Sequence, residues 1–198
     1  MMRISRKAEP PDFHTRVRAR GQAFLNANPH VPPVPLTFWR GKDYWKHAKL
    51  DLRESYTWIC AFAAMQIEEV TGSKTVEHFK PRAIYPDSAY EWSNFRLVCG
   101  ELNGRKGDYE DVLDPFTIPH FAFDLNPVSG EVFVHARCPV RSRRKALSTI
   151  NRLKLHAPSF CKNRGRHIKA ILRRGWDEEH AVEQSPFVFL RLREQGLI

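Results

Sequence analysis

The chain has 198 residues, of which 42% are hydrophobic and 27% charged, and its formal net charge is +10. This length supports one domain with a real core and excludes two large domains, and the composition excludes a disordered chain. No window approaches 18 apolar residues, so the sequence predicts no membrane span. The first seven residues lack the apolar stretch of a secretory signal, and we therefore expect a cytoplasmic protein that does not bind membranes.

The first half of the chain alternates between helical and extended patterns. A basic, proline-rich arm carries a possible helix over 13–27. Apolar residues at three- and four-residue intervals predict a helix over 42–65. Short strands are expected over 76–79 and 95–99, and a short helix or turn over 100–107.

The second half predicts a hairpin and then helices. Alternating residues over 121–125 and 131–135 flank a turn of Asn, Pro and Gly. Two basic amphipathic helices follow, over 143–155 and 162–172. The apolar tail from residue 187 either closes the core or docks on a partner, and the sequence alone slightly favours docking.

Positive charge is concentrated in one part of the chain. Residues 132–176 contain thirteen Lys or Arg and no Asp or Glu. This excess is locally uncompensated, which favours a polyanion such as nucleic acid over a solvated helical surface that is merely basic. The expected contacts on this side are Arg143, Arg144, Lys145 and Arg152.

A second group of polar residues suggests hydrolysis of a phosphodiester. His78 is a plausible general base, because its ordinary pKa lies near neutral pH. Glu77 and Asn103 offer oxygens to a Mg²⁺ ion, which prefers one or two protein ligands plus waters and phosphate. Asn94 would hold His78 in place. The remaining candidates, expected to face phosphates, are Arg105 and Lys106.

Each of these residues also has a purely structural interpretation. Glu77 could be a surface carboxylate paired with a nearby Lys or Arg. Asn94 could tie a loop to a strand, as buried amides commonly do. Asn103 could cap the helix that follows it. Arg105 and Lys106 could be solvated turn residues.

The stretch that contains these residues is TVEHFKPRAIYPDSAYEWSNFRLVCGELNGRKGD, residues 75–108. It resembles the HNH endonuclease family, and more narrowly the HNH subunit of Septu-type and retron antiphage defence systems. The resemblance implies an α+β fold in which a ββα-metal core with a short β-hairpin is surrounded by N- and C-terminal helices. The implied organisation is an arm over 1–40, a nuclease core over 41–156, and a C-terminal helix and tail over 157–198 in the same compact unit.

Carried over residue by residue, the resemblance implies His78 as general base, Asn94 as the orienting residue, and Glu77 and Asn103 as ligands of Mg²⁺ or Mn²⁺. It also implies an SMC- or ABC-like ATPase as partner subunit. Relatives commonly hold a structural zinc with two CxxC pairs. Here the second position of each pair is occupied by an apolar residue, so no structural zinc is expected and apolar packing should replace it. The four positions concerned are Cys60, Ala63, Cys99 and Leu102.

The leading interpretation is therefore a metal-dependent HNH endonuclease that cuts double-stranded DNA by a one-metal mechanism within an antiphage complex. One alternative is a catalytically weakened HNH-like scaffold that binds nucleic acid or the ATPase without cutting. Another is a nuclease of the same type that cleaves RNA. The four widely spaced cysteines are expected to be reduced thiols.

Overall fold

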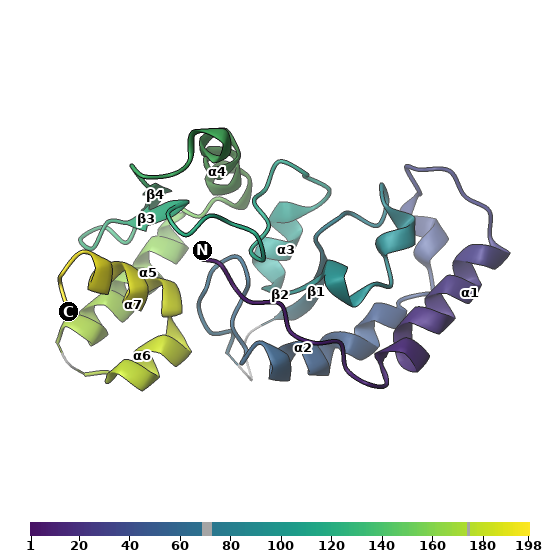
Figure 1. The fold of residues 1–198 in the computed structure, drawn as a ribbon, viewed down its shortest axis with the longest axis horizontal. Coiled ribbons are helices and arrows are strands. Elements are labelled where there is room, and N and C mark those ends of the chain that lie inside the picture. The colour runs from purple at the N-terminus through teal and green to yellow at the C-terminus, as the bar shows by residue number, and fades with distance from the viewer. Residues whose placement is uncertain (69–72, 174) are drawn as a thin grey trace.

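The computed structural model describes residues 1–68, 73–173 and 175–198. Within these ranges the fold is mixed α+β, with seven α-helices and two small antiparallel sheets of two strands each. Figure 1 shows the first sheet near the middle of the molecule, with α1 on one side and α4 to α7 on the other. In the described ranges, no helix combines the length and the apolar character that crossing a bilayer requires.

The central sheet joins β1 (Lys74–His78) to β2 (Phe95–Cys99), and α3 (Gly100–Lys106) follows β2 without a linker. The register places His78 opposite Phe95 at one end of the sheet. The strands and the short helix expected from the sequence are confirmed to within two residues. Because β1 ends at His78, the side chains of its last residues lie at the edge where the chain leaves the sheet.

The N-terminal arm packs against this sheet. Phe13 is fully buried, and its ring meets Trp92 edge to face with the centroids 5.5 Å apart. The Trp92 indole donates a hydrogen bond to the carbonyl of Lys7 at 3.0 Å. A short π-helical turn (His14–Arg18) leads into α1 (Ala19–Ala27), so the expected helix over 13–27 is confirmed.

The helix expected over 42–65 is wrong beyond Ser55. A 3₁₀ turn (Tyr44–Ala48) is followed by α2 (Lys49–Ser55), after which Thr57 and Trp58 adopt positive φ angles of 45° and 63°. Residues in the left-handed conformation end an α-helix, and glycine is the residue that usually marks this position in a sequence. Thr57 and Trp58 are not glycines, so the sequence did not indicate where the helix ends. The apolar residues over 60–65 are buried in a tight turn, so their spacing does not reflect a helix.

The C-terminal half contains the expected hairpin and helices. Strands β3 (Phe123–Leu125) and β4 (Val132–Val134) are followed by α4 (Val140–Leu153) and α5 (Pro158–Leu172). The hairpin turn ends at Gly130, whose φ is 73° and where an added Cβ would lie 2.4 Å from the carbonyl oxygen of Cys161. The turn and α5 thus approach too closely for any side chain at this position.

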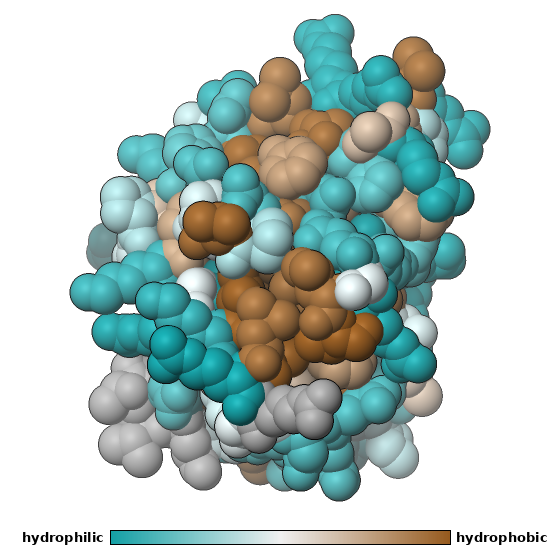
Figure 2. Space-filling view, turned by 90° about the vertical axis from the view of Figure 1, so that its left-hand side faces the viewer, coloured by the Kyte–Doolittle hydropathy of each residue, from teal (hydrophilic) through white to brown (hydrophobic). Residues whose placement is uncertain are grey.

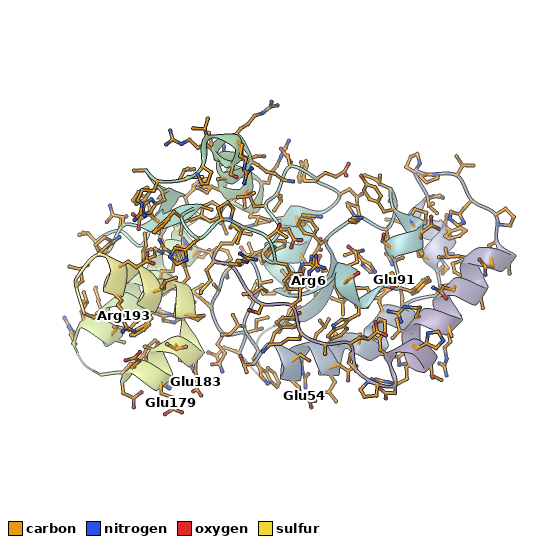
Figure 3. The ribbon with its side chains drawn as sticks, in the orientation of Figure 1. Arg6, Glu54, Glu91, Glu179, Glu183 and Arg193 are labelled. Carbon is orange, nitrogen blue, oxygen red and sulfur yellow. The ribbon has the colours of Figure 1, made fainter. Side chains whose placement is uncertain are left out.

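The chain ends in α6 (Glu178–Gln184) and α7 (Pro186–Glu194). Phe187, Val188 and Leu192 are buried, so the apolar tail contributes to the core. Figure 2 shows that hydrophobic side chains also remain at the surface on this end of the molecule. Exposed carboxylates gather on α6, where Figure 3 labels Glu179 and Glu183, while the basic helix α4 lies at the opposite edge of this half in the same view.

Candidate functional site

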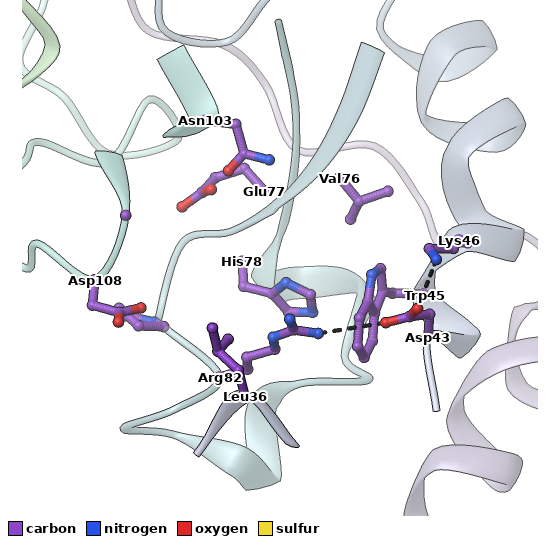
Figure 4. A pocket seen from close by; sticks show the side chains of 12 residues that line it. Leu36, Asp43, Trp45, Lys46, Val76, Glu77, His78, Arg82, Asn103 and Asp108 are labelled. Atoms are coloured by element: carbon purple, nitrogen blue, oxygen red, sulfur yellow. Dashed lines mark hydrogen bonds and ion pairs between the residues drawn. The ribbon is translucent and has the colours of Figure 1, made fainter. Parts of the chain in front are cut away.

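A pocket of about 350 Å³ opens at the edge of the sheet where β1 ends. Glu77 and His78 from β1 line it, together with Asn103 from α3 and Asp108 from the loop after α3. Figure 4 shows these side chains around one hollow, although Glu77 and His78 are neighbours in a strand. The chain turns away directly after His78, which lets two consecutive residues reach the same pocket.

The Glu77 carboxylate is almost fully buried, with 4% of the residue exposed. The ammonium of Lys106, itself without exposed surface, lies 3.0 Å from Glu77 Oε1. Lys106 acts on this carboxylate mainly through its charge. Burial raises the pKa of Glu77 to about 7, because the attraction of Lys106 offsets only part of the cost of removing a charge from water.

His78 is held by its ring. Its Nε2 lies 2.9 Å from the carbonyl oxygen of Ala89, which fixes Nε2 as the protonated nitrogen and leaves the lone pair on Nδ1. The rings of Trp45 and Phe95 meet the imidazole edge to face at 5.0 and 5.3 Å. Burial among these rings lowers the pKa of His78 to about 3, so the imidazole is neutral at pH 7.

Asn94 is buried and acts on the backbone around His78. Its Oδ1 accepts a hydrogen bond from the Lys80 N–H at 2.7 Å, and its Nδ2 donates to the carbonyls of Lys80 and Ser88 at 3.0 Å each. These bonds fix the chain two residues after His78 and one residue before Ala89, the acceptor of the histidine ring. Asn94 is therefore placed to orient His78, and it is not among the residues that line the pocket.

Asn103 is oriented by the neighbouring strand. Its Nδ2 donates to Thr75 Oγ1 at 2.8 Å, and the Thr75 hydroxyl donates in turn to the Val98 carbonyl at 2.9 Å. With the amide nitrogen occupied in this way, the amide oxygen faces the Glu77 carboxylate in Figure 4. Helix α3 begins at Gly100, so Asn103 lies inside the helix, and its side chain serves no cap there.

The two basic residues after Asn103 are both engaged within the protein. Arg105 donates to the Leu153 carbonyl at 2.9 Å and pairs with Glu101, while its guanidinium lies over the Phe160 ring. Lys106 is buried beside Glu77 and donates to the Gly107 carbonyl at 3.1 Å. Neither side chain extends freely toward a substrate in this arrangement.

The outer surface of α4, which we call the α4 basic face, presents Arg141, Arg144, Lys145 and Arg152 to solvent, while Ala146, Ile150 and Leu153 are buried on the other side. Arg152 pairs with Asp111 at 3.3 Å and lies 3.9 Å from the centroid of the Tyr109 ring. Arg143 donates to the carbonyls of Cys138 and Ala136 at 3.0 and 2.8 Å. Within the basic stretch Arg164 is buried, and Arg174 lies outside the described residues.

Asp43, Arg82 and Asp108 are among the pocket residues that were not predicted as site residues. Arg82 lines the pocket four positions after His78, and Asp108 is the last residue of the motif-bearing stretch. Both lie close in the sequence to predicted site residues, and this proximity could have identified them as candidates. Asp43 enters from the 3₁₀ turn before α2, some 35 residues upstream, and no sequence pattern pointed to it.

Cys60 and Cys99, for which no zinc was expected, lie together. The Cys60 thiol accepts from the backbone N–H groups of Ala63 at 3.5 Å and of Cys99 at 3.4 Å. Burial alone would raise the Cys60 pKa, but the hydrogen bonds from the Cys99 thiol and these N–H groups lower it to about 7. Ala63 and Leu102 are buried in the core, as expected for apolar packing at the positions of the missing ligands.

The donor set of the pocket suits a hard divalent cation held by few protein ligands. Among the described residues, no three His, Cys, Asp or Glu side chains are grouped so as to hold a metal ion by themselves. Mg²⁺, however, commonly takes one or two protein oxygens and keeps several waters. The Glu77 carboxylate, whose Oε1 is paired with Lys106 at 3.0 Å, and the amide oxygen of Asn103 could supply these oxygens.

Comparison with known proteins gives one partial similarity. A segment of this chain is 30% identical over 79 residues to the Septu protein PtuB of Bacillus thuringiensis. The match covers 40% of this chain and 30% of the length of the relative. No family model matches the chain. Part of the protein is thus similar to part of a Septu protein, and most of the length of that relative has no counterpart in the match.

Proposed function

We propose that this protein is a metal-dependent endonuclease of the HNH type that hydrolyses phosphodiester bonds of DNA. The observation that carries the proposal is the convergence of Glu77, His78 and Asn103 on one pocket at the end of β1. A pair of strands followed directly by a helix supplies these three residues, as the ββα-metal arrangement requires. The arrangement combines a neutral base with two oxygen ligands, which is what hydrolysis of a phosphodiester needs.

In this proposal Glu77 and Asn103 hold a Mg²⁺ or Mn²⁺ ion. The bound ion would supply positive charge to stabilise the developing negative charge on the phosphate and on the leaving oxygen. Glu77 must be ionised to bind it, and the charge of Lys106 offsets part of the cost of ionising this buried carboxylate. Thr75 keeps the Asn103 amide from rotating its nitrogen into the pocket.

His78 takes the proton from the attacking water on Nδ1. The Ala89 carbonyl anchors the opposite nitrogen, so the ring cannot turn away, and it stabilises the imidazolium that forms. A neutral histidine is ready to accept a proton throughout the physiological pH range. The negative phosphate in the pocket favours the protonated ring, which offsets the low pKa that burial imposes in the free protein.

We further propose that the protein works in antiphage defence, as the nuclease subunit beside an ATPase. The similarity to the Septu protein PtuB supports the defence role. The ATPase partner rests on the resemblance of residues 75–108 to the HNH subunits of such systems. The α4 basic face would hold the DNA backbone without reading its sequence, since basic side chains on one exposed surface contact phosphates rather than bases.

A second candidate function is a non-cutting subunit with the same fold. The 3.0 Å contact between Lys106 and Glu77 favours it, because a buried ammonium competes with a metal ion for the same carboxylate. The apolar residues at two of the four expected zinc-ligand positions also favour it. The scaffold would bind nucleic acid or the ATPase through the same surfaces.

A cleavage assay separates the two functions. Supercoiled plasmid DNA, linear duplex DNA and a structured RNA are incubated with the protein and its ATPase partner in Mg²⁺, Mn²⁺ or EDTA. The nuclease proposal expects cleavage in metal and none in EDTA, with loss of at least about 100-fold in His78→Ala. The matched control is His156→Ala, which replaces an exposed histidine outside the pocket. If wild type and His78→Ala both bind DNA and neither cuts, the scaffold function replaces the nuclease.

A further inference from the structure

We propose that Arg82 is the phosphate-binding residue of the pocket and receives the phosphodiester on the side opposite Glu77 and Asn103. The inference rests on the proposed function, because it names the group that holds the substrate in the same site. Arg82 lines the pocket, and its side chain keeps 26% of its surface exposed. In Figure 4, His78 lies between Arg82 on one side and Glu77 and Asn103 on the other. A group bound in the pocket therefore faces Arg82 on one side and the two oxygen-bearing residues on the other.

Two aromatic rings hold the guanidinium of Arg82. Its Cζ lies 4.3 Å from the centroid of the Trp45 ring and 5.4 Å from that of Trp39. Contact with a ring face uses the charge and the flat surface of the guanidinium but none of its N–H groups. The two tryptophans therefore fix the position of Arg82 and leave its hydrogen-bond donors available.

The acidic neighbour of Arg82 forms only a loose ion pair with it. Asp43 Oδ1 lies 3.7 Å from Arg82 Nη1, beyond hydrogen-bond distance, while Asp43 Oδ2 lies 2.6 Å from the ammonium of Lys46. Lys46 thus holds the carboxylate in a close pair of its own. Arg82 Nη1 is buried and has no hydrogen-bond partner among the described residues. A buried donor without an acceptor is costly, and a ligand oxygen would remove that cost.

The chemistry of the pocket identifies the ligand as a phosphodiester. A guanidinium offers two parallel N–H groups that match two oxygens of a phosphate or a carboxylate. Glu77 and Asp108 on the pocket wall would repel any small anion, carboxylate or phosphate, that brings neither a cation nor contacts elsewhere on the protein. A phosphodiester on a long polyanion is favoured instead, because the chain carries a net charge of +10 and the exposed α4 basic face.

The chain contains a matched control for the stacking interaction. Arg53 lies over Trp58 at 4.3 Å, the same distance as Arg82 over Trp45, and each side chain has a buried nitrogen without a hydrogen bond among the described residues. Arg53 belongs to α2 and does not line the pocket. Replacing Arg53 therefore removes an equivalent cation–π contact without removing a group that faces the substrate.

The test is binding of a fluorescent 30-base-pair DNA duplex to the full-length protein in EDTA, measured by anisotropy over a range of salt concentrations. Arg82→Ala is expected to weaken binding about 5- to 10-fold near 0.1 M salt and to lower the slope of log affinity against log salt by about 0.9, as for one lost phosphate contact. Arg82→Lys should restore the slope, since it keeps the charge. Arg53→Ala should match the wild type in both quantities.

Folding is checked by thermal unfolding, and Arg82→Gln, which retains most of the side-chain length, replaces Arg82→Ala if the latter does not fold. An unchanged salt slope in folded Arg82→Ala or Arg82→Gln, or the same loss in Arg53→Ala, overturns the inference, as does a wild type that does not bind DNA. Because binding is measured without metal, a wild type that binds through Arg82 but never cuts keeps this inference and refutes only the nuclease. A wild type that cuts while Arg82→Ala binds normally refutes only this inference.

Discussion

The pocket and the α4 basic face use charge in opposite ways. In the pocket, Glu77 and Lys106 are buried against each other, and His78 is fixed by a backbone carbonyl. On α4, Arg144 and Lys145 extend into solvent. Buried groups with fixed partners hold a defined geometry, whereas exposed charges are screened and mobile. From this difference we expect the pocket to determine the rate of cleavage and the α4 basic face to determine the affinity for DNA. The predictions below test that division.

The largest effect is expected from the base. His78→Ala should lower the cleavage rate about 1,000-fold, because it removes the neutral base from the pocket, while DNA affinity in EDTA stays within about twofold. Single-turnover cleavage and anisotropy measure the two quantities. An equal loss of binding and cleavage would show that His78 supports the fold of the site rather than the reaction.

The second effect is on stability. Asn94→Ala removes three hydrogen bonds of a buried side chain to the backbone of Lys80 and Ser88 and leaves a gap in its place, so the free energy of unfolding should fall by about 2–4 kcal/mol. Urea unfolding measures it, with the exposed Asn151→Ala as control. A loss below about 1 kcal/mol would mean that Asn94 does not tie the loop to β2.

The α4 basic face should affect binding alone. Arg144→Ala combined with Lys145→Ala is expected to weaken DNA binding about 10-fold near 0.1 M salt and to lower the salt slope by about 1.8, for two lost phosphate contacts. The cleavage rate at saturating DNA should be unchanged. The control is Arg20→Ala, an exposed arginine of α1. A change in the saturated rate would contradict the division of roles.

The smallest effect is the pH dependence of stability. The pKa of His78 is lowered to about 3 in the folded protein from an ordinary value of 6.5, so the unfolded chain takes up the proton first as pH falls. Stability should therefore decrease below about pH 6.5, by about 1 kcal/mol per pH unit, and His78→Gln should remove that decrease. Glu77 acts with the opposite sign, because its raised pKa costs stability as pH rises from about 4.5 through 7.

Urea unfolding of wild type and His78→Gln between pH 4.5 and 7.5 gives the difference directly. The Glu77 contribution is present in both proteins and cancels from it. Parallel curves for the two proteins would mean that His78 is not held neutral by burial.

The central sheet and α3 could be predicted because their information is local. Four of the five residues 95–99 are apolar, turn signals bound the segment, and α3 follows the strand at once. The rest of the pocket depends on long-range packing. Asp43 and Trp45 reach it from another element, and the burial of Lys106 beside Glu77 follows from how α3 docks on β1. The end of α2 was missed for a local reason, since Thr57 and Trp58 are ordinary residues in a left-handed conformation.

The most direct test of the account is a titration of the full-length protein with Mn²⁺, followed by calorimetry and by the electron paramagnetic resonance of the ion. The account predicts one site in the wild type and an affinity at least about 10-fold weaker in Glu77→Gln. The double variant Glu77→Gln with Lys106→Met, which removes the ammonium left unpaired, serves as the folded control and should also bind weakly. Equal Mn²⁺ affinity in wild type and both variants would contradict a metal site at Glu77.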